Sequence, residues 1–238
     1  MALTPAFALL DFKTDPLGAT LTIVLLVMSL GFHEAAHAWT AWKCGDSTGK
    51  DLGRITLNPI PHIDPFMTIV LPVISLLSMG FLFGGAKPVP VNFHRLKNPW
   101  RDMSLVALAG PMSNLLLAVL FMELTRFFVM TGYYNGSADD AGLRLDDMLP
   151  RVLIATANVN VLLAVFNLIP IPPLDGSRVM AWLLPDSLRA SYLSIERYGL
   201  IIVIALVGFV PSFNNFTFGT VRNVAHTLGR ALWPGGYW

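Results

Sequence analysis

Two histidines and a glutamate occur at residues 33–37 in the pattern HEAAH, a spacing that can do metal chemistry. On a helix, His33 and His37 project from the same face, one turn above the other. Two imidazoles in that arrangement can share one zinc ion, and Glu34 beside them is placed to take a proton from zinc-bound water. The alternative is a set of polar residues that face a helix interface without a metal. Three ionisable groups in an apolar helix are costly and usually functional, which favours the zinc site.

A catalytic zinc has three protein ligands and an open position for water, so a third ligand must come from elsewhere in the chain. Asp175 is the best candidate, because it follows an apolar stretch in the sequence NLIPIPPLDG. The prolines keep this backbone irregular, and Gly176 allows it to turn sharply. Taken alone, such a turn would be read as a helix stop followed by an N-cap aspartate. Beside HEAAH, the pattern favours a metal ligand.

The elements that must position these residues are membrane helices. Of the 238 residues, 54% are hydrophobic and only 13% are charged, about half the charged fraction of a soluble domain. A bilayer core needs about 20 apolar residues per helix. Apolar stretches occupy residues 17–42, 66–83, 102–130, 149–169 and 198–210. We therefore expect an all-α polytopic membrane protein with about five to six membrane helices, in a single domain over residues 1–238.

The charged residues between these stretches predict the orientation. Basic side chains follow the first stretch, precede 102–130 and follow 149–169. The loop that joins 102–130 to 149–169 is instead acidic. Positive charge marks the cytoplasmic side, so we expect HEAAH and Asp175 to open towards the cytoplasm.

If 66–83 crosses the membrane fully, the chain must return before residue 102 without a helix, because GGAKPVPVN (84–92) is too rich in glycine and proline to form one. We predict that residues 84–95 re-enter as an extended or β segment beside the active site. Whether 66–83 spans the membrane stays open.

Three motifs in this order resemble the site-2 protease family of intramembrane metalloproteases: HEAAH on an apolar helix, AGPMSN opening another, and NLIPIPPLDG closing a later one. The resemblance covers about residues 25–185. LNPIPHIDP (57–65) and GGAKPVPVN further resemble the compact prokaryotic branch of the family, which lacks a PDZ domain.

The resemblance implies roles for six residues: the zinc ligands His33, His37 and Asp175, the catalytic Glu34, and the amides Asn167 and Asn114. Amides aimed at the scissile peptide can hold a substrate strand or stabilise the tetrahedral oxyanion. Hydrogen bonding between helices is the alternative for both asparagines.

The expected function is that of an intramembrane zinc metalloprotease with one zinc ion per chain. The family implies substrates that are single-span membrane proteins, cut within or near their transmembrane segments, and a location in a prokaryotic cell membrane. The net charge of +1 gives no reason to expect nucleic acid as a partner beside the lipid bilayer. Two alternatives remain open: an inactive relative that binds membrane helices, and an intramembrane metal transporter.

Overall fold

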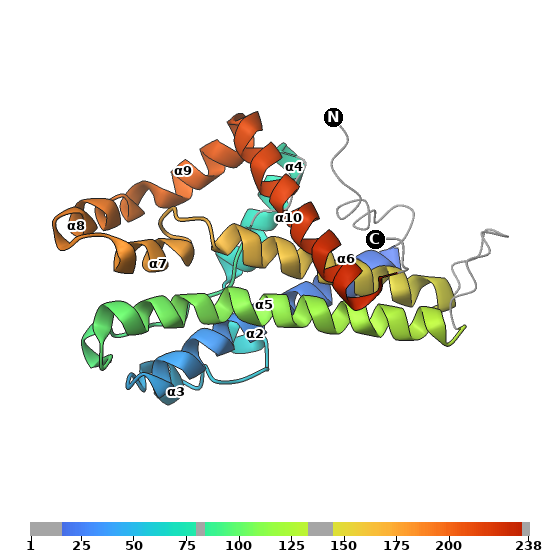
Figure 1. Ribbon diagram of the computed structural model, residues 1–238, viewed down its shortest axis with the longest axis horizontal. Helices are drawn as coiled ribbons and strands as arrows, with labels where there is room; N and C mark the ends of the chain where they lie inside the picture. The colour runs from blue at the N-terminus through green and yellow to red at the C-terminus, as the bar shows by residue number, and fades with distance from the viewer. Residues whose placement is uncertain (1–15, 80–83, 133–144, 235–238) are drawn as a thin grey trace.

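The computed structural model describes residues 16–79, 84–132 and 145–234, and these residues form helices and connecting segments without a β-strand. Figure 1 shows their arrangement. In chain order the elements are α2 (Pro16–Lys43), α3 (Thr48–Asp51), the 3-10 helix η1 (Ile60–His62), the π-helix η2 (Pro65–Val70), α4 (Leu71–Met79), the 3-10 helix η3 (Phe93–Arg95), α5 (Pro99–Met130), α6 (Leu145–Asn167), α7 (Gly176–Leu183), α8 (Asp186–Ser194), α9 (Glu196–Phe209) and α10 (Pro211–Leu232).

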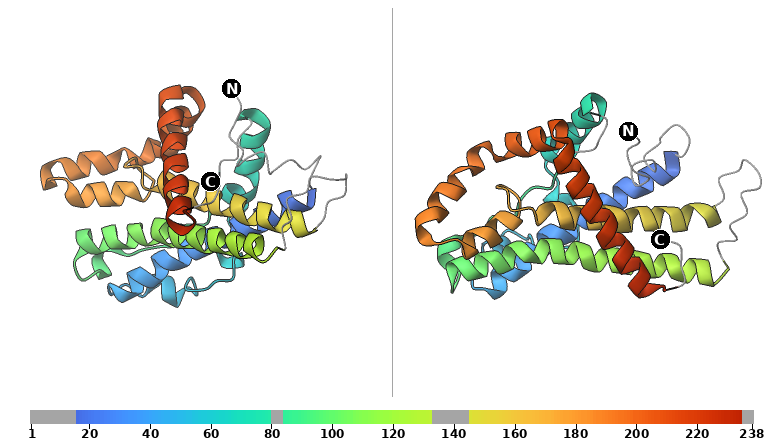
Figure 2. Two further views of the ribbon diagram at one scale, coloured as in Figure 1. Left: turned by 45° about the vertical axis from the view of Figure 1, so that its right-hand side comes forward. Right: turned by 45° about the horizontal axis from the view of Figure 1, so that its top comes forward.

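Three long helices, α2, α5 and α6, pack against one another and form the centre of the molecule (Figures 1 and 2). Within the described residues, these three are long and apolar enough to cross a membrane. The pair α8 and α9, bent by 65°, would make a fourth span if it counts as one. The expected all-helical membrane fold is therefore confirmed, whereas the count of five to six spans is not. The stretch predicted at 66–83 becomes η2 and the short α4, and its last residues lie outside the described part of the chain.

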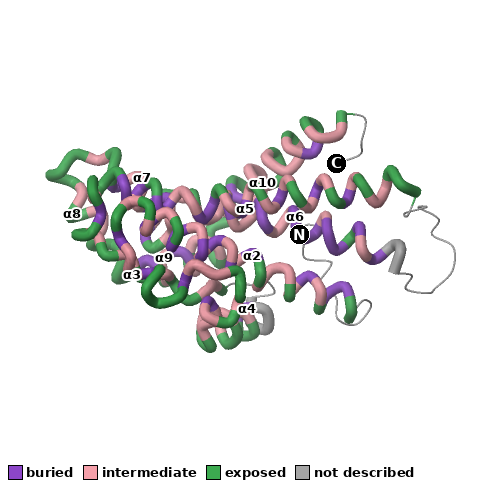
Figure 3. Tube along the Cα trace, turned by 90° about the horizontal axis from the view of Figure 1, so that it is seen from below, coloured by how far each residue is buried: buried purple, intermediate pink, exposed green. Residues whose placement is uncertain are grey.

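The three central helices approach closely because their contact faces carry small residues. Ala38 on α2, Ala118 on α5 and Ala164 on α6 are each 0% exposed. On the opposite face of α5, Leu116 and Phe127 are exposed, which is typical of side chains that meet lipid. Figure 3 shows this alternation of buried and exposed turns along the helices. Lipid is as apolar as leucine, so close packing of small residues, rather than burial of large ones, holds such helices together.

Helix α10 lies obliquely across α6 and α5 and closes one side of the bundle (Figure 2). Its apolar face packs on a buried cluster formed by α5 and α6. Met122 and Val161 lie at the centre of that cluster, and Val221 and Leu228 of α10 cover it. At the other end of the bundle, α7 packs on α5 and leads into α8. The start of α5, the end of α2 and α7 therefore lie at one end of the molecule, beside the turn that contains Asp175 (Figure 1).

Candidate metal centre

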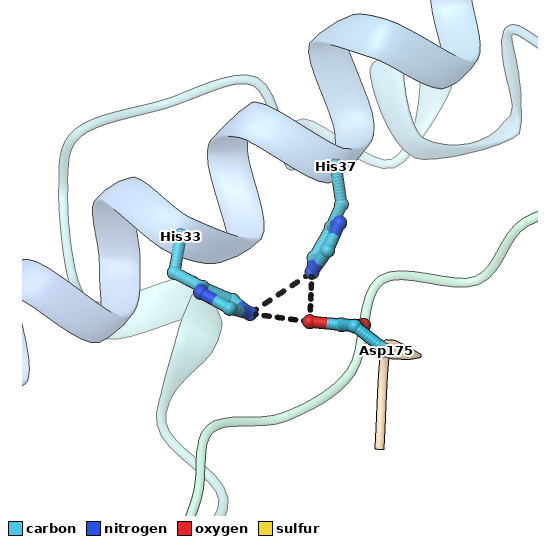
Figure 4. Close-up of side chains that lie close together, drawn as sticks. All are labelled: His33, His37 and Asp175. Atoms are coloured by element: carbon cyan, nitrogen blue, oxygen red, sulfur yellow. Dashed lines mark hydrogen bonds and ion pairs between the residues drawn. The ribbon is translucent and has the colours of Figure 1, made fainter. Parts of the chain in front are cut away.

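The side chains of His33, His37 and Asp175 point towards one another between α2 and the turn before α7 (Figure 4). His33 Nε2 lies 3.0 Å from His37 Nε2. Asp175 Oδ2 lies 3.2 Å from His33 Nε2 and 3.4 Å from His37 Nε2. Within the described chain, this is the group of His, Cys, Asp and Glu side chains that could hold a metal ion.

Helix α2 places both histidines well inside the membrane-spanning segment. They are ten and six residues before Lys43, the end of α2, which corresponds to about 15 and 9 Å along the helix axis. Both are nearly buried, with exposed fractions of 6% and 8%. The donor atoms therefore lie at membrane depth, nearer to the end of the bundle that carries Lys43.

The turn between α6 and α7 carries Asp175 back to these histidines. Asp175 occupies the position before α7, yet its side chain makes no capping hydrogen bond and turns to the imidazoles instead. Gly176 lets the turn pass close to the end of α6, because a Cβ there would lie 2.2 Å from the carbonyl oxygen of Leu168. Tyr192 of α8 donates to the carbonyl of Pro170 at 2.9 Å, which ties the turn to the next helices. The N-cap alternative for Asp175 does not describe this geometry.

The hydrogen bonds of the two imidazoles leave their Nε2 atoms free to bind a metal. His37 Nδ1 lies 2.7 Å from the carbonyl oxygen of Val106, which can only accept, so Nδ1 carries the proton. His33 Nδ1 lies 2.5 Å from Oδ1 of Asn114, which fixes the same tautomer. Two Nε2 lone pairs then face the buried Asp175 Oδ2, which has no hydrogen-bond partner in the described structure. Three acceptors facing one another repel unless a metal ion or a proton lies between them.

Zinc fits this donor set. Bonds of about 2.0–2.1 Å in a tetrahedral site separate neighbouring ligand atoms by about 3.3 Å, close to the spacings seen here. Two imidazoles and one carboxylate are also the ligand types of a catalytic zinc site, in which a fourth position stays open.

Gly110 of α5 brings a bare stretch of backbone against the same imidazoles. A Cβ at this position would lie 2.5 Å from Nε2 of both His33 and His37. Gly110 is the glycine of the AGPMSN motif, and the structure shows that it packs against the two imidazoles. The adjacent helix leaves room for the donor atoms only because residue 110 has no side chain.

Glu34 contacts the segment 84–92 directly. Its Oε2 accepts the backbone N–H of Val89 at 2.9 Å. The segment is extended, as expected, but it pairs with no strand among the described residues, so the predicted β structure is not confirmed. Gly85 N–H donates to Met67 O, and Lys87 N–H donates to His62 O. The segment thus lies against Glu34 of α2 and is held by the backbone N–H of every second residue from Gly85 to Val89.

Asp46, after α2, anchors the far end of this segment. Its Oδ2 accepts the N–H of Asn92 at 2.6 Å, and its Oδ1 accepts from the N–H and hydroxyl of Thr48. Burial alone would raise the pKa of the Asp46 carboxyl, but these donors outweigh burial and hold the pKa below its usual value. Asp46 therefore remains a carboxylate that fixes residue 92 beside the first membrane helix.

The two asparagines expected near the substrate lie in different surroundings. Asn114 is fully buried between His33 and Asn160. Asn167 is partly buried, and its amide donates to the carbonyl of Leu163 one turn back in α6. Sequence reasoning missed Asn160, although an asparagine within an apolar span is a signal in its own right.

Comparison with known proteins identifies the family of this chain. The model of peptidase family M50 matches residues 21–210. YwhC of Bacillus subtilis (strain 168), named as a zinc metalloprotease, is 38% identical over 201 residues, which cover 84% of this chain and 85% of YwhC. Rip2 of Mycolicibacterium smegmatis, named likewise, is 32% identical over 204 residues, covering 84% of this chain and 71% of Rip2. No solved structure gives a significant match. This chain belongs to peptidase family M50, the family of the site-2 proteases, and is a zinc metalloprotease of the membrane.

Proposed function

We propose that this protein hydrolyses peptide bonds within or next to the transmembrane segments of single-span membrane proteins, as in regulated intramembrane proteolysis. His33, His37 and Asp175 hold one zinc ion, and Glu34 is the general base. The proposal places the protein in a prokaryotic cell membrane, with the site open to the cytoplasm. It includes all of residues 1–238 in one protease domain.

The observation that carries this proposal is the depth of the donor cluster. His33, Glu34 and His37 lie about 9–15 Å inside the end of a membrane-spanning helix, and Asp175 meets the two histidines there. A protease that cut only soluble loops would have no use for a site at that depth. Within the described residues the donors also form one cluster instead of a series along a path, which favours hydrolysis over metal transport.

The chemistry divides between the metal and the chain. A zinc ion in such a site acts as a Lewis acid that polarises a carbonyl and lowers the pKa of water. Glu34 takes the proton of the attacking water and passes it to the leaving amine. The Val89 N–H donates to Oε2 and orients the carboxylate, which leaves Oε1 without a described hydrogen bond and open to take the proton. Asn167 lies at the end of α6. Its amide would hold the substrate strand once its hydrogen bond to the carbonyl of Leu163 is broken. The same role for Asn114 would require its amide to leave Asn160.

The extended segment 84–92 is the part of the chain suited to hold an unwound substrate. A transmembrane helix hides its peptide bonds, so it must open locally before attack, and an extended edge can hold the opened stretch by strand addition. The N–H groups of Gly85, Lys87 and Val89 are already used within the protein. In an extended chain the backbone groups of alternate residues point to opposite edges. Pro88 and Pro90 lie on the edge opposite Lys87 and Val89 and have no N–H, so that edge offers mainly carbonyl acceptors. The substrate would therefore supply the donors.

Replacing residues 88–91 with Gly-Ser-Gly-Ser should lower cleavage by roughly 100-fold or more, because a flexible edge no longer orients the substrate. Zinc should stay bound at one ion per chain, since none of the three donor residues contacts this segment through a described hydrogen bond. Cleavage of a single-span substrate in detergent and zinc content measure the two effects. Val91→Ala, which keeps both prolines, is the control and should cleave normally. Normal cleavage by the Gly-Ser variant would rule out the edge.

The proposed function is tested by reconstituting the protein with a tagged single-span substrate in liposomes and mapping the cut by mass spectrometry. A cut inside the transmembrane segment, lost on zinc chelation and restored by zinc, is the expected result. Cuts confined to the soluble flanks would show a metalloprotease that acts outside the membrane. Zinc flux into the liposomes without any cut would support the transporter.

A further inference from the structure

A line of buried polar side chains runs from the metal centre across all three central helices. Asn114 of α5 accepts from His33 of α2 at 2.5 Å and donates its Nδ2 to Oδ1 of Asn160 of α6 at 2.9 Å. Asn160 in turn donates to Ser29 Oγ, one turn before His33 on α2, at 3.0 Å. Both asparagines are 0% exposed and Ser29 is 2% exposed. The function proposed above assigns no role to Asn160 or Ser29.

The direction of every hydrogen bond in this line is fixed at Asn160. Its Nδ2 also lies 2.9 Å from the backbone carbonyl of Thr156, which can only accept. The Ser29 hydroxyl gives its own hydrogen to Leu25 O, so its oxygen accepts from Asn160 as well. With both amide hydrogens committed to these two acceptors, the Asn160 oxygen must face Asn114.

That orientation passes to His33 through a single residue. Because the oxygen of Asn160 faces it, Asn114 must present its Nδ2 to Asn160 and its Oδ1 to His33. His33 then carries its proton on Nδ1 and has a lone pair on Nε2, the atom that faces Asp175. If the Asn114 amide turned over, its N–H would face Nδ1 and favour the tautomer with Nε2 protonated, which has no Nε2 lone pair for a metal.

His37 does not depend on this line. Its Nδ1 bonds the carbonyl of Val106, an acceptor that cannot turn over. The two histidines therefore reach the same tautomer by different means, one through backbone and one through two side-chain amides. A change at Asn160 should alter His33 and leave His37 as it is.

We propose that Asn160 is a positioning residue of the metal centre, which sets the tautomer of His33 by fixing the orientation of the Asn114 amide. The inference rests on the proposed role of His33 as a zinc ligand. Helix α6 then supports the site in two ways. The turn that follows it supplies Asp175, and its Asn160 sets which nitrogen of His33 is protonated.

Asn160→Leu tests this directly. The leucine has a similar size and leaves Asn114 free to turn over, so zinc affinity should fall roughly 10- to 100-fold. Competition with a chelator measures the affinity, and cobalt absorption reports the ligand geometry. Thr156→Val is the matched control, because its buried hydroxyl bonds only the carbonyl of Val152 in its own helix, and it should bind zinc like the unaltered protein. Ser29→Ala should lose less than Asn160→Leu, since Thr156 O still orients the amide.

Nitrogen NMR of the zinc-free protein provides a readout that a purely structural role would not move. The chain has five histidines, so ¹⁵N-histidine labelling gives few signals. We expect His33 and His37 both protonated on Nδ1 in the unaltered protein, and only His33 changed in Asn160→Leu. Wild-type His33 protonated on Nε2 would overturn the inference even if the variant does not fold. So would a folded Asn160→Leu with unchanged zinc affinity. A wild-type protein that binds no zinc would instead refute the proposed ligand set.

Discussion

A Glu34→Gln variant should keep its zinc ion and lose cleavage by roughly 10²- to 10⁴-fold, the usual contribution of a general base. Glutamine has the same shape, and its side-chain oxygen can still accept the Val89 N–H that Glu34 Oε2 accepts. The proposed zinc ligands His33, His37 and Asp175 are untouched, so the metal site should be intact. What disappears is the ability to take a proton from water and return it to the leaving amine.

Mass spectrometry measures the zinc content, and single-turnover cleavage of a single-span substrate measures the rate of hydrolysis. The control is Glu123→Gln on the same membrane protein, because Glu123 pairs with Arg126 on α5 and contacts none of the metal donors. It should cleave within about twofold of wild type, because a partly exposed ion pair contributes only about 0–1 kcal/mol to stability. Loss of zinc from Glu34→Gln would identify Glu34 as a ligand, and retained cleavage would place the base elsewhere.

The sequence predicted which residues would meet, because the chemistry of zinc limits the choices. HEAAH sets two imidazoles on one helix face, and a catalytic zinc needs one further ligand. Asp175 followed from that requirement together with the proline-rich turn. The structure brings the three side chains within hydrogen-bonding distance of one another. The pattern of apolar stretches likewise predicted α2, α5 and α6, which are long enough to leave a clear signal.

The supporting contacts could not be predicted, because they depend on how the helices are rotated against one another. Asn160 is one polar letter in an apolar stretch, and nothing local shows that it faces Asn114 on another helix. The same holds for Gly110, whose importance arises from the imidazoles of a helix nearly 80 residues earlier. The extended segment 84–92 was predictable from its prolines and glycines, but the bond from Val89 to Glu34 was not.

A Gly110→Ala variant should lose zinc binding almost completely, with an affinity at least 100-fold below that of wild type. The added Cβ would lie 2.5 Å from Nε2 of both His33 and His37, nearer than a real Cβ approaches a ring nitrogen. Neither imidazole can easily withdraw, because Asn114 and Val106 O hold their Nδ1 atoms. The methyl group would therefore compete with the metal for the same space, or push α5 away from α2.

Alanine favours a helix over glycine by about 1 kcal/mol, which offsets part of the roughly 1–3 kcal/mol that such overpacking costs, so the fold should survive the substitution. Gly219→Ala on α10 is the matched control, because a Cβ there meets nothing within 4 Å. It gains the same helix preference and should bind zinc and cleave normally. Zinc titration and melting temperature in detergent, measured on both variants, distinguish a blocked site from an unfolded one. A Gly110→Ala protein with full zinc content would mean that α2 and α5 lie farther apart at this point. In that case Asn114 would also lie too far from His33 to set its tautomer, because the same helix contact brings the two side chains together.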